Sequence, residues 1–386
     1  MRIAFFVQYN HQVGTYFRWH NLAKALQQLG HEVDVYAGDH DWKARRRTEW
    51  SDGIFYTIIP ALPTARLLYA PNDIFSAMRW LFHLPKKEYE VYHLYQPFLH
   101  AAVAWNYLRL FKRKAKFVYD WDDLWTGGLF LQPKGWREKY LMLVTKWLET
   151  RLPQQANGVT VCSSYLLQLL KPLNNVAIIK NGFWAKSLPQ KTSLRKKWDL
   201  LDNTFYLGFI GKTADELDWV IGALLLLKEQ TNLKVGLLIA GPPDSYVKPL
   251  LQQCKHQDSI RYLGNLSAND AVEVAAAIDL GLIPLADNAF NRSRFPVKFL
   301  DFLSVLTPVY VSDVGDVGQL ARNLSGAFLG SSTKSNWITD IIPVVQQLTQ
   351  GKQYLPDIEH LTPFSWQKIA EELVDFYQTL CKQIKQ

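Results

Sequence analysis

The residues best suited to chemistry stand in the segment NRSRFPVKFLDFLSVLTPVY, residues 291–310. Pro296 is typical of a helix start, where the backbone amides of Val297 and Lys298 can bind phosphate oxygens. Lys298 adds positive charge at the helix end that favours anions, so a bound anion would explain its position. Asp301 lies one turn later on the same face and can accept the two hydroxyls of a ribose. The segment predicts a nucleotide site, and the alternative is an i,i+3 surface ion pair worth about 0.2–0.5 kcal/mol.

Two glycines stand where a strand is expected to turn into a helix. Gly211 and Lys212 end the apolar run in FYLGFIGKT, so the lysine can reach a diphosphate from the end of a strand. Gly14 is the single glycine of YNHQVGTYF and would let backbone amides approach a phosphate or a sugar closely. A glycine that merely permits the turn is the alternative. The G-x-G-x-x-G fingerprint of dinucleotide-binding domains is absent here, which argues against a dehydrogenase.

Three carboxylates, those of Asp120, Asp122 and Asp123, stand together in VYDWDDLW at the expected end of a buried strand. If they are buried together, their mutual repulsion raises the pKa of at least one of them, as is common in catalytic sites. Asp122 or Asp120 would then be the candidate general base for an acceptor hydroxyl. The alternative is that an aspartate caps the next helix. His93 and His100 lie near the end of another expected strand, and a structural role is favoured for both.

Short apolar runs alternate with helical patterns along the whole chain. Buried strands separated by helices indicate parallel α/β sheets, and two such sheets fit the length of 386 residues. A polar, turn-rich stretch over residues 185–203 predicts the linker between them. We therefore expect a first domain over residues 1–190, a second over 204–364, and an amphipathic helix over 365–386. Ligands of α/β proteins bind at the carboxyl ends of the strands, so a cleft shared by the two sheets is the expected site.

Positive charge is concentrated in the first half of the chain. Residues 1–190 contain 24 Lys and Arg against 14 Asp and Glu, whereas residues 191–386 contain 19 against 21. The first half also holds 10 of the 14 tryptophans, and tryptophan together with basic side chains suits an anionic bilayer surface. One alternative is a soluble enzyme that is merely basic. Another is a nucleic-acid-binding protein, although no helix-turn-helix, zinc or RNA-binding signature accompanies the charge.

The cysteines and the apolar runs predict the compartment. The three cysteines are widely spaced and form no C-x-x-C pair, so neither a disulfide framework nor a thiolate metal site is predicted, and a reducing compartment fits best. The first apolar run, residues 3–7, is too short for a signal peptide. The longest, residues 219–227, falls well below the roughly 20 residues of a membrane span. We expect a soluble, cytoplasmic protein that meets a membrane only from the side, on its inner face.

In order along almost the whole chain, these motifs resemble the retaining GT-B glycosyltransferases of glycosyltransferase family 4. In the first half the resemblance lies in MRIAFFVQYNHQVGTYFRWHNLAKALQQLGHEVDVYAGD, ANGVTVCSSYLLQLL and VAIIKNGF. In the second half it lies in Gly211-Lys212, in IRYLGNLSANDAVEVAAAIDLGLIPL, and in Pro296, Lys298, Asp301 and Pro308-Val309, which resemble the family's P-x-K-x-x-E and P-V motifs. The closing FSWQKIA resembles the family's final helix, which crosses back to the first domain.

The resemblance implies two Rossmann-like domains that face a central cleft, the first binding the acceptor and the second a UDP- or GDP-linked sugar. It implies transfer of a hexose to an acceptor hydroxyl with retention, the departing phosphate taking the acceptor proton. The diphosphate would lie on Lys212, Lys298 and the amides of Val297 and Lys298, with the ribose on Asp301, so the two lysines also stabilise the leaving group. No metal and no cofactor is expected, because lysines and helix amides neutralise the diphosphate. The acceptor would be a glycan, a lipid-linked or membrane-proximal glycan, or a small molecule, as in polysaccharide or glycolipid biosynthesis.

The sequence departs from the family pattern at several positions. Where members often carry two glutamates eight positions apart, Ser293 stands near the expected donor sugar and Asp301 at the ribose. The lysine that usually follows the Gly-Lys pair is missing, and Leu217 and Asp218 stand there instead. The histidine of the family's T-x-H-D segment corresponds to Trp121. The sequence therefore does not identify the sugar that the site selects.

These departures leave alternatives to a retaining transferase. One is an inverting transferase that uses Asp122 or Asp120 as general base, and another is an epimerase of nucleotide sugars. From a different class, the chain would be an inert nucleotide-sugar-binding partner protein. Release of free nucleoside diphosphate from a nucleotide sugar separates an enzyme from such a binder.

Overall fold

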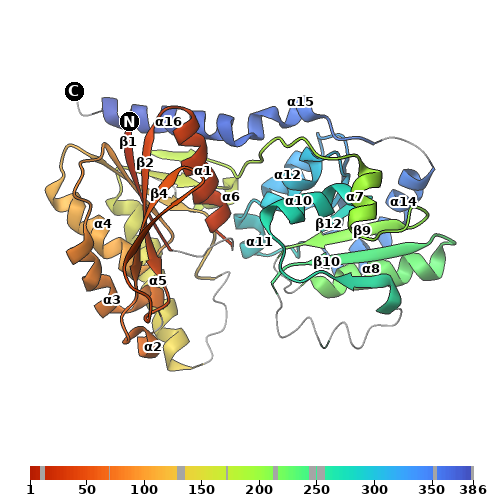
Figure 1. Ribbon diagram of the computed structural model, residues 1–386, viewed down its shortest axis with the longest axis horizontal. Helices are drawn as coiled ribbons and strands as arrows, with labels where there is room; N and C mark the ends of the chain where they lie inside the picture. Colours follow the sequence, from red (N-terminus) through yellow and green to blue (C-terminus); the bar gives the residue numbers. More distant parts are fainter. Residues whose placement is uncertain are drawn as a thin grey trace. The chain divides into compact units, whose positions relative to one another are not determined.

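The computed structural model divides the chain into two compact units. Unit 1 consists of residues 1–181 and 366–386, and unit 2 of residues 182–365. Figure 1 shows that each unit has its own sheet covered by helices. The structure describes residues 1–8, 14–68, 70–127, 135–170, 173–211, 216–242, 249, 257–350 and 354–383. Within these residues no helix has the length and apolar character needed to cross a membrane.

Unit 1 contains an eight-stranded sheet in the order β3-β4-β2-β1-β5-β6-β7-β8. Neighbouring strands pair parallel except β3, which forms an antiparallel edge with β4. The strands are β1 (Arg2–Gln8), β2 (Glu32–Asp39), β3 (Arg47–Ser51), β4 (Ile54–Pro60), β5 (Val91–Tyr95), β6 (Lys116–Trp121), β7 (Gly158–Val161) and β8 (Val176–Ile178). Every residue of β5 and β6 is buried, as continuous apolar runs predict for parallel strands covered on both faces.

Helices cover both faces of this sheet. α1 and α16 pack against each other on one face, and α3, α4 and α5 form the layer on the other (Figure 1). The helical segments of unit 1 are α1 (Tyr16–Gln28), α2 (Ala65–Leu68), η1 (Ala70–Asn72), α3 (Ile74–Arg79), η2 (Trp80–His83), α4 (Leu99–Phe111), α5 (Trp136–Gln155), α6 (Ser164–Leu169) and α16 (Trp366–Lys382). The last helix joins unit 1 because buried side chains such as Leu373 and Tyr377 complete its core.

Unit 2 contains a six-stranded sheet in the order β11-β10-β9-β12-β13-β14, and all of its strand pairs are parallel. The strands are β9 (Phe205–Ile210), β10 (Val235–Ala240), β11 (Ile260–Tyr262), β12 (Leu280–Ile283), β13 (Val309–Ser312) and β14 (Ala327–Gly330). With the sheet of unit 1, this confirms the two parallel-sheet α/β domains that the sequence predicts.

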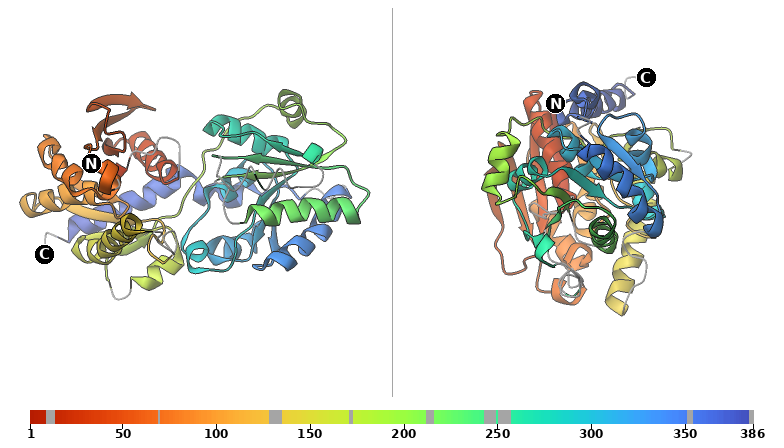
Figure 2. Two further views of the ribbon diagram at one scale, coloured as in Figure 1. Left: turned by 90° about the horizontal axis from the view of Figure 1, so that it is seen from below. Right: turned by 90° about the vertical axis from the view of Figure 1, so that its right-hand side faces the viewer.

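The helices of unit 2 also lie on both faces of their sheet. Figure 2 shows α8 and α14 side by side, and their buried side chains form one core cluster with β9, β10 and β12. On the other face Phe302 of α12 packs so closely on β12 that Gly281 leaves no space for a Cβ atom. The helical segments are α7 (Lys191–Lys197), α8 (Leu217–Gln230), η3 (Gln257–Ser259), α10 (Ala268–Ala277), α11 (Ala289–Ser293), α12 (Val297–Ser304), α13 (Gly315–Ala321), α14 (Lys334–Thr349), α15 (Ile358–Leu361) and η4 (Thr362–Phe364).

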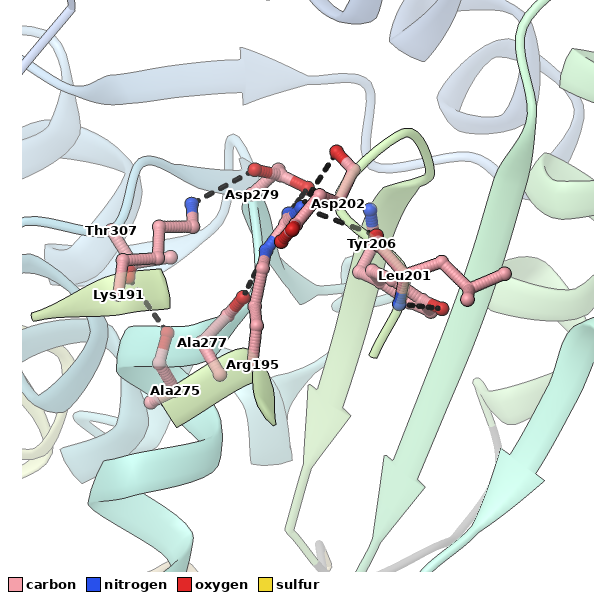
Figure 3. Close-up of polar contacts among 9 residues, drawn as sticks. All are labelled: Lys191, Arg195, Leu201, Asp202, Tyr206, Ala275, Ala277, Asp279 and Thr307. Carbon is pink, nitrogen blue, oxygen red and sulfur yellow. Dashed lines mark hydrogen bonds and ion pairs between the residues drawn. The ribbon is translucent and has the colours of Figure 1, made fainter. Parts of the chain in front are cut away.

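Helix α7 lies in the stretch predicted to be a linker, yet the stretch belongs to unit 2. Figure 3 shows the reason: the buried Arg195 pairs with Asp279 at 2.5 Å and donates to the carbonyl of Ala277 at 3.2 Å. Lys191 reaches the other oxygen of Asp279 at 2.8 Å, and the same carboxylate accepts the backbone N–H of Tyr206 on β9. The polar composition of this stretch thus serves a network inside unit 2.

Candidate active site

Helix α12 carries the residues predicted to hold a nucleotide. Pro296 is its N-cap residue, and the proline side chain makes no capping hydrogen bond to the first turn of the helix. Lys298 Nζ lies 3.0 Å from Asp301 Oδ2, and the two side chains keep 30% and 19% of their surface exposed. The structure therefore brings Lys298 and Asp301 together on one partly exposed side of the first turn, and the i,i+3 ion pair named as the alternative is present.

Hydrogen bonds of Glu216 join loops that follow two adjacent strands of unit 2. β9 and β12 pair with each other, so their carboxyl ends share one edge of the sheet. Glu216 immediately precedes α8, and its Oε1 accepts from Asn291 Nδ2 at 2.9 Å and from the backbone N of Ala286 at 3.3 Å. Asn291 belongs to α11, the helix just before α12. Glu216 thus ties α11 and the loop after β12 to the start of α8 at the edge where α/β proteins bind ligands.

Gly211 follows β9 directly at this edge. A Cβ atom on Gly211 would meet no atom within 4 Å, so the described neighbours leave space beside its α-carbon. Its carbonyl oxygen would lie only 1.7 Å from a Cβ atom on Gly241, so the ends of β9 and β10 can approach this closely only with glycine at position 241. Lys212, the predicted diphosphate ligand, lies outside the described residues. The predicted diphosphate contacts of both residues stay predictions.

Ser293 lies at the end of α11 and is fully buried. Its Oγ donates to the carbonyl oxygen of Phe290 at 2.7 Å, a bond within the same helix. A buried hydroxyl that donates to its own helix is not presented to a ligand in this arrangement. The geometry therefore gives no support to the predicted contact between Ser293 and the donor sugar.

Asp120 lies in the interior of unit 1, and hydrogen bonds engage both of its oxygens. Arg18 donates from Nε to Oδ2 and from Nη2 to Oδ1, each at 2.8 Å, and Thr160 Oγ1 donates to Oδ1 at 2.5 Å. Burial by itself lowers the pKa of Arg18, but the charge and hydrogen bonds of Asp120 more than offset this and raise it. Asp120 is therefore the counter-ion of Arg18, and its role as a general base stays a prediction.

Asp122 is buried without a comparable partner. In the described part of the chain, its Oδ1 accepts no hydrogen bond, while its backbone carbonyl accepts from Cys162 Sγ at 2.9 Å. Burial, followed by the negative charges of Asp123 and Asp120, raises the pKa of Asp122 well above that of an ordinary aspartate. This direction agrees with the expectation that at least one of these carboxylates has a raised pKa, although burial contributes more to the rise than the neighbouring charges do. A carboxyl group with a raised pKa is suited to acid–base chemistry.

The start of α1 lies at the same edge of the first sheet. Gly14 has a φ angle of +59°, in the left-handed region that favours glycine, and turns the chain into α1. Thr15, the N-cap residue, accepts a hydrogen bond from Gln96 Nε2 at 2.6 Å. Gln96 follows β5 and has a φ angle of +71°, which is uncommon for a residue other than glycine. The start of α1 is therefore bound to the end of β5, and a contact between Gly14 and a ligand stays a prediction.

Two buried histidines have structural partners. His93 Nδ1 lies 2.5 Å from the hydroxyl of Tyr377, so it joins β5 to α16, and His100 Nδ1 lies 2.8 Å from the carbonyl oxygen of Pro71. Burial lowers the pKa of His93 to about 3 and that of His100 to about 4, so both rings are neutral at pH 7. These positions agree with the structural role that the sequence favours.

A pocket with a cavity volume of about 340 Å³ lies in unit 1 beside the loop that follows β6. At its wall the carboxylate of Glu149 accepts hydrogen bonds from Trp121 Nε1 at 3.1 Å and from the backbone N of Trp125 and Thr126 at 2.8 and 2.9 Å. Burial raises the pKa of Glu149, and these hydrogen bonds offset only part of that rise. The other lining residues are Leu124, Lys146, Thr150, Pro153, Gln154, Leu169, Leu170 and Leu173. The pocket combines an apolar wall with polar side chains of α5.

Sequence reasoning missed Arg18, Glu149 and Glu216. Arg18 and Glu149 each occupy a buried position of a helix whose buried side is otherwise largely apolar, and a charge at such a position is the signal that could have found them. Their partners could not have been found in this way, because Arg18 and Asp120 are 102 residues apart. Within the described residues no three metal-binding side chains gather into a cluster.

The chain matches two family models, the glycosyl transferase 4-like domain over residues 13–182 and the glycosyl transferases group 1 model over residues 204–345. A Bacillus subtilis (strain 168) protein named as the teichuronic acid biosynthesis glycosyltransferase TuaH is 23% identical over 239 residues, which are 58% of this chain and 55% of TuaH. The match thus spans about half the length of that relative.

Solved structures share the fold over the whole chain. Sucrose-phosphate synthase from Thermosynechococcus elongatus has a TM-score of 0.75 at 17% identity and covers 98% of this chain and 99% of its own. A Rickettsia africae glycosyltransferase has a TM-score of 0.67 at 14% identity, over 99% and 98% of the two chains. Anabaena HepE has a TM-score of 0.64 at 18% identity, over 100% of both. With the two family models, these matches show that the chain belongs to the GT-B glycosyltransferases of the family 4 type.

Proposed function

We propose that the protein transfers a hexose from a nucleoside-diphosphate sugar to an acceptor hydroxyl, with the donor bound by unit 2. The observation that carries the proposal is the start of α12, where Lys298 and Asp301 pair on the first turn after the N-cap residue Pro296, whose side chain makes no capping hydrogen bond. Such a helix start attracts phosphate, and a bound nucleotide would take its diphosphate to Lys298 and its ribose hydroxyls to Asp301. Lys212, next to Gly211, would supply a second positive charge.

UDP is the nucleotide that we propose first, with GDP as the alternative. Structures of Anabaena HepE are in complex with UDP, with UDP and glucose, and with UDP-glucose. An Escherichia coli trehalose-6-phosphate structure is bound with UDP-2-fluoro glucose. These proteins have the fold of this chain at 10–18% identity, so their ligands support the class of donor rather than a particular sugar.

The main catalytic work would be to stabilise the leaving diphosphate. As the bond from the anomeric carbon to the phosphate oxygen breaks, negative charge grows on the phosphate, where Lys298, Lys212 and the amides of α12 would offset it. In the retaining reaction that we propose, the acceptor oxygen bonds to the anomeric carbon on the face that the phosphate leaves. The acceptor proton passes to the departing phosphate, so neither a protein base nor a metal is required.

Asp122 supports a second candidate, an inverting transfer. Its Oδ1 is buried without a hydrogen-bond partner among the described residues, and its pKa is raised by burial. Such a carboxylate accepts a proton more readily than an ordinary aspartate does, as a general base for an acceptor hydroxyl must. Asp120 is the weaker base because Arg18 and Thr160 occupy its oxygens.

The acceptor is proposed to bind unit 1. The pocket beside Trp121 has room for a sugar ring or part of a lipid chain, and its lining offers both apolar contacts and hydrogen-bonding groups. The name of TuaH places that relative in teichuronic acid biosynthesis, which supports a polysaccharide or a lipid-linked glycan as the acceptor.

The experiment that tests the function is incubation with UDP-glucose, UDP-N-acetylglucosamine or GDP-mannose while free nucleoside diphosphate is followed. A transferase releases UDP or GDP, faster with a suitable acceptor, whereas a binding protein releases neither. The anomeric configuration of the product, measured by NMR, separates retention from inversion. Binding of nucleotide sugars without any release, with all acceptor classes tested, would overturn the enzymatic proposal.

A further inference from the structure

Helix α5 carries apolar side chains on two opposite sides. Its inner side, with Leu141 and Leu148, is buried in unit 1. Its outer side exposes three large apolar residues, the outer stripe: Trp136, Leu143 and Trp147, which are 59%, 62% and 54% exposed. One apolar side is enough to pack a helix on its own domain, so a second one that faces solvent indicates a partner outside the unit.

The outer stripe is straight and has basic residues on both flanks. At about 100° per residue, positions seven and eleven residues apart fall within roughly 20° of each other around the helix axis. Lys139 and Lys146 therefore lie on one flank of the stripe and Arg151 on the other, and all three are exposed. In the part of the chain that the structure describes, none of these three forms an ion pair with a carboxylate.

The two acids of α5 do not lie beside the stripe. Glu149 is buried on the inner side and accepts hydrogen bonds from the loop after β6. Glu138 lies roughly 160° from Trp136 around the helix axis. The surface around the stripe is thus apolar along its centre and positive at its flanks.

The neighbouring helix extends the apolar surface. Arg137 Nε donates to the carbonyl oxygen of Leu67 at 2.8 Å, which places α2 beside the start of α5. The side chain of Leu67 is itself 60% exposed. A second exposed apolar residue therefore accompanies Trp136 at this end of the stripe.

We propose that the outer stripe of α5 docks unit 1 on an anionic lipid bilayer, as a helix that lies in the plane of the interface. Tryptophan favours the interface between headgroups and acyl chains, and Lys and Arg beside it attract anionic headgroups. A second copy of the chain is a poorer partner, because the positive flanks of the two stripes would repel each other. A nucleic acid is also a poorer partner, because it would leave the apolar side chain of Leu143 exposed to water. Docking by the outer stripe does not depend on the proposed function. In a transferase, docking would also hold the protein close to lipid-linked acceptors.

The test is co-sedimentation of the full chain with vesicles of equal parts phosphatidylcholine and phosphatidylglycerol, compared with pure phosphatidylcholine. Binding should rise with phosphatidylglycerol and fall with salt, because the basic flanks are screened over about 8–10 Å at physiological ionic strength. The variant Trp136→Gln/Leu143→Gln/Trp147→Gln should lose at least tenfold in vesicle affinity. The matched control, Leu355→Gln/Ile358→Gln, changes exposed apolar residues of unit 2 and should bind as the unchanged protein does.

Two further measurements show whether the triple variant changes only docking. Its melting temperature reports on folding, and its UDP affinity reports on the donor site in unit 2, to which the outer stripe does not belong. Both should stay unchanged in the triple variant. Equal vesicle binding by the triple variant and the unchanged protein would overturn the proposal, as would a protein that stays in the supernatant with anionic vesicles at low salt. A dimer in vesicle-free solution that the triple variant dissociates would assign the stripe to self-association instead.

Discussion

Arg18 of α1 and Asp120 of β6 form a bidentate ion pair in the interior of unit 1, with both N–O distances at 2.8 Å. The pair joins the first helix to a central strand, and Arg18 Nη1 also donates to Asn181 Oδ1 at 3.1 Å. Asp120 is the carboxylate two residues before Asp122. The ion pair therefore helps fix the end of β6, which Asp122 follows directly.

Removing Arg18 should destabilise unit 1 strongly. Arg18→Met leaves the carboxylate of Asp120 buried without its counter-ion, and we expect a loss of about 3–5 kcal/mol in the free energy of unfolding, measured with urea. As a control, Lys368→Met breaks the exposed pair with Glu371 and should cost less than about 1 kcal/mol. Arg18→Met/Asp120→Asn should recover part of the loss. Equal losses for Arg18→Met and Lys368→Met would contradict the role of the pair.

The stability contributed at Asp122 should depend on pH. Because its pKa is raised in the folded state, the folded protein favours the protonated carboxyl group, and stability is lost as pH rises from the ordinary aspartate pKa, about 3.9, through the folded value. Asp122→Asn cannot ionise, so its free energy of unfolding should exceed that of the unchanged protein at pH 7–8. The two should converge near pH 4. Parallel stability curves over this range would show that Asp122 does not titrate in this way.

Transferase kinetics of the same variant separate the two mechanisms. If Asp122 is the base of an inverting reaction, Asp122→Asn should lower kcat by about 10²–10⁴-fold with little change in UDP affinity. A retaining reaction that uses the departing phosphate predicts a much smaller change in kcat.

Asp301 and Lys298 should affect different parts of a nucleotide. Asp301→Asn should weaken UDP binding but leave pyrophosphate binding nearly unchanged, because only UDP carries the ribose hydroxyls. Lys298→Ala should weaken both ligands by about 1.5–3 kcal/mol, the range for charge-assisted hydrogen bonds. Calorimetric titration of each variant with each ligand gives the four values. If Asp301→Asn lowers the two affinities equally, the residue serves the fold of α12 rather than the ribose.

Gly38 of β2 should not tolerate a side chain while His100 is present. A Cβ atom at this position would lie 2.1 Å from His100 Nε2, so Gly38→Ala should cost about 1–3 kcal/mol through overpacking. In a His100→Ala background the same substitution should cost clearly less, because the ring that it meets is gone. Thermal unfolding of the four proteins measures the coupling. Additive losses would place the origin of the cost elsewhere.

The sequence by itself determined the fold class and the order of the elements. Continuous apolar runs such as those of β5 and β6 predict buried parallel strands, and the structure has them. The closeness of Asp120 to Asp122 and the three-residue spacing from Lys298 to Asp301 are local, so their consequences could be predicted: a raised carboxyl pKa and an i,i+3 contact. Local spacing is readable because the geometry of strands and helices fixes it.

Only the tertiary structure decided which of these groups are paired and which are not. Arg18 is 102 residues from Asp120, and no pattern along the chain links them, so the sequence could not predict that Asp120 has a buried counter-ion. The polar stretch around Arg195 resembled a linker for the same reason, because Asp279 lies 84 residues away. Whether a charge is a catalyst, a counter-ion or a surface group depends on burial and on partners brought together by folding, and the sequence states neither.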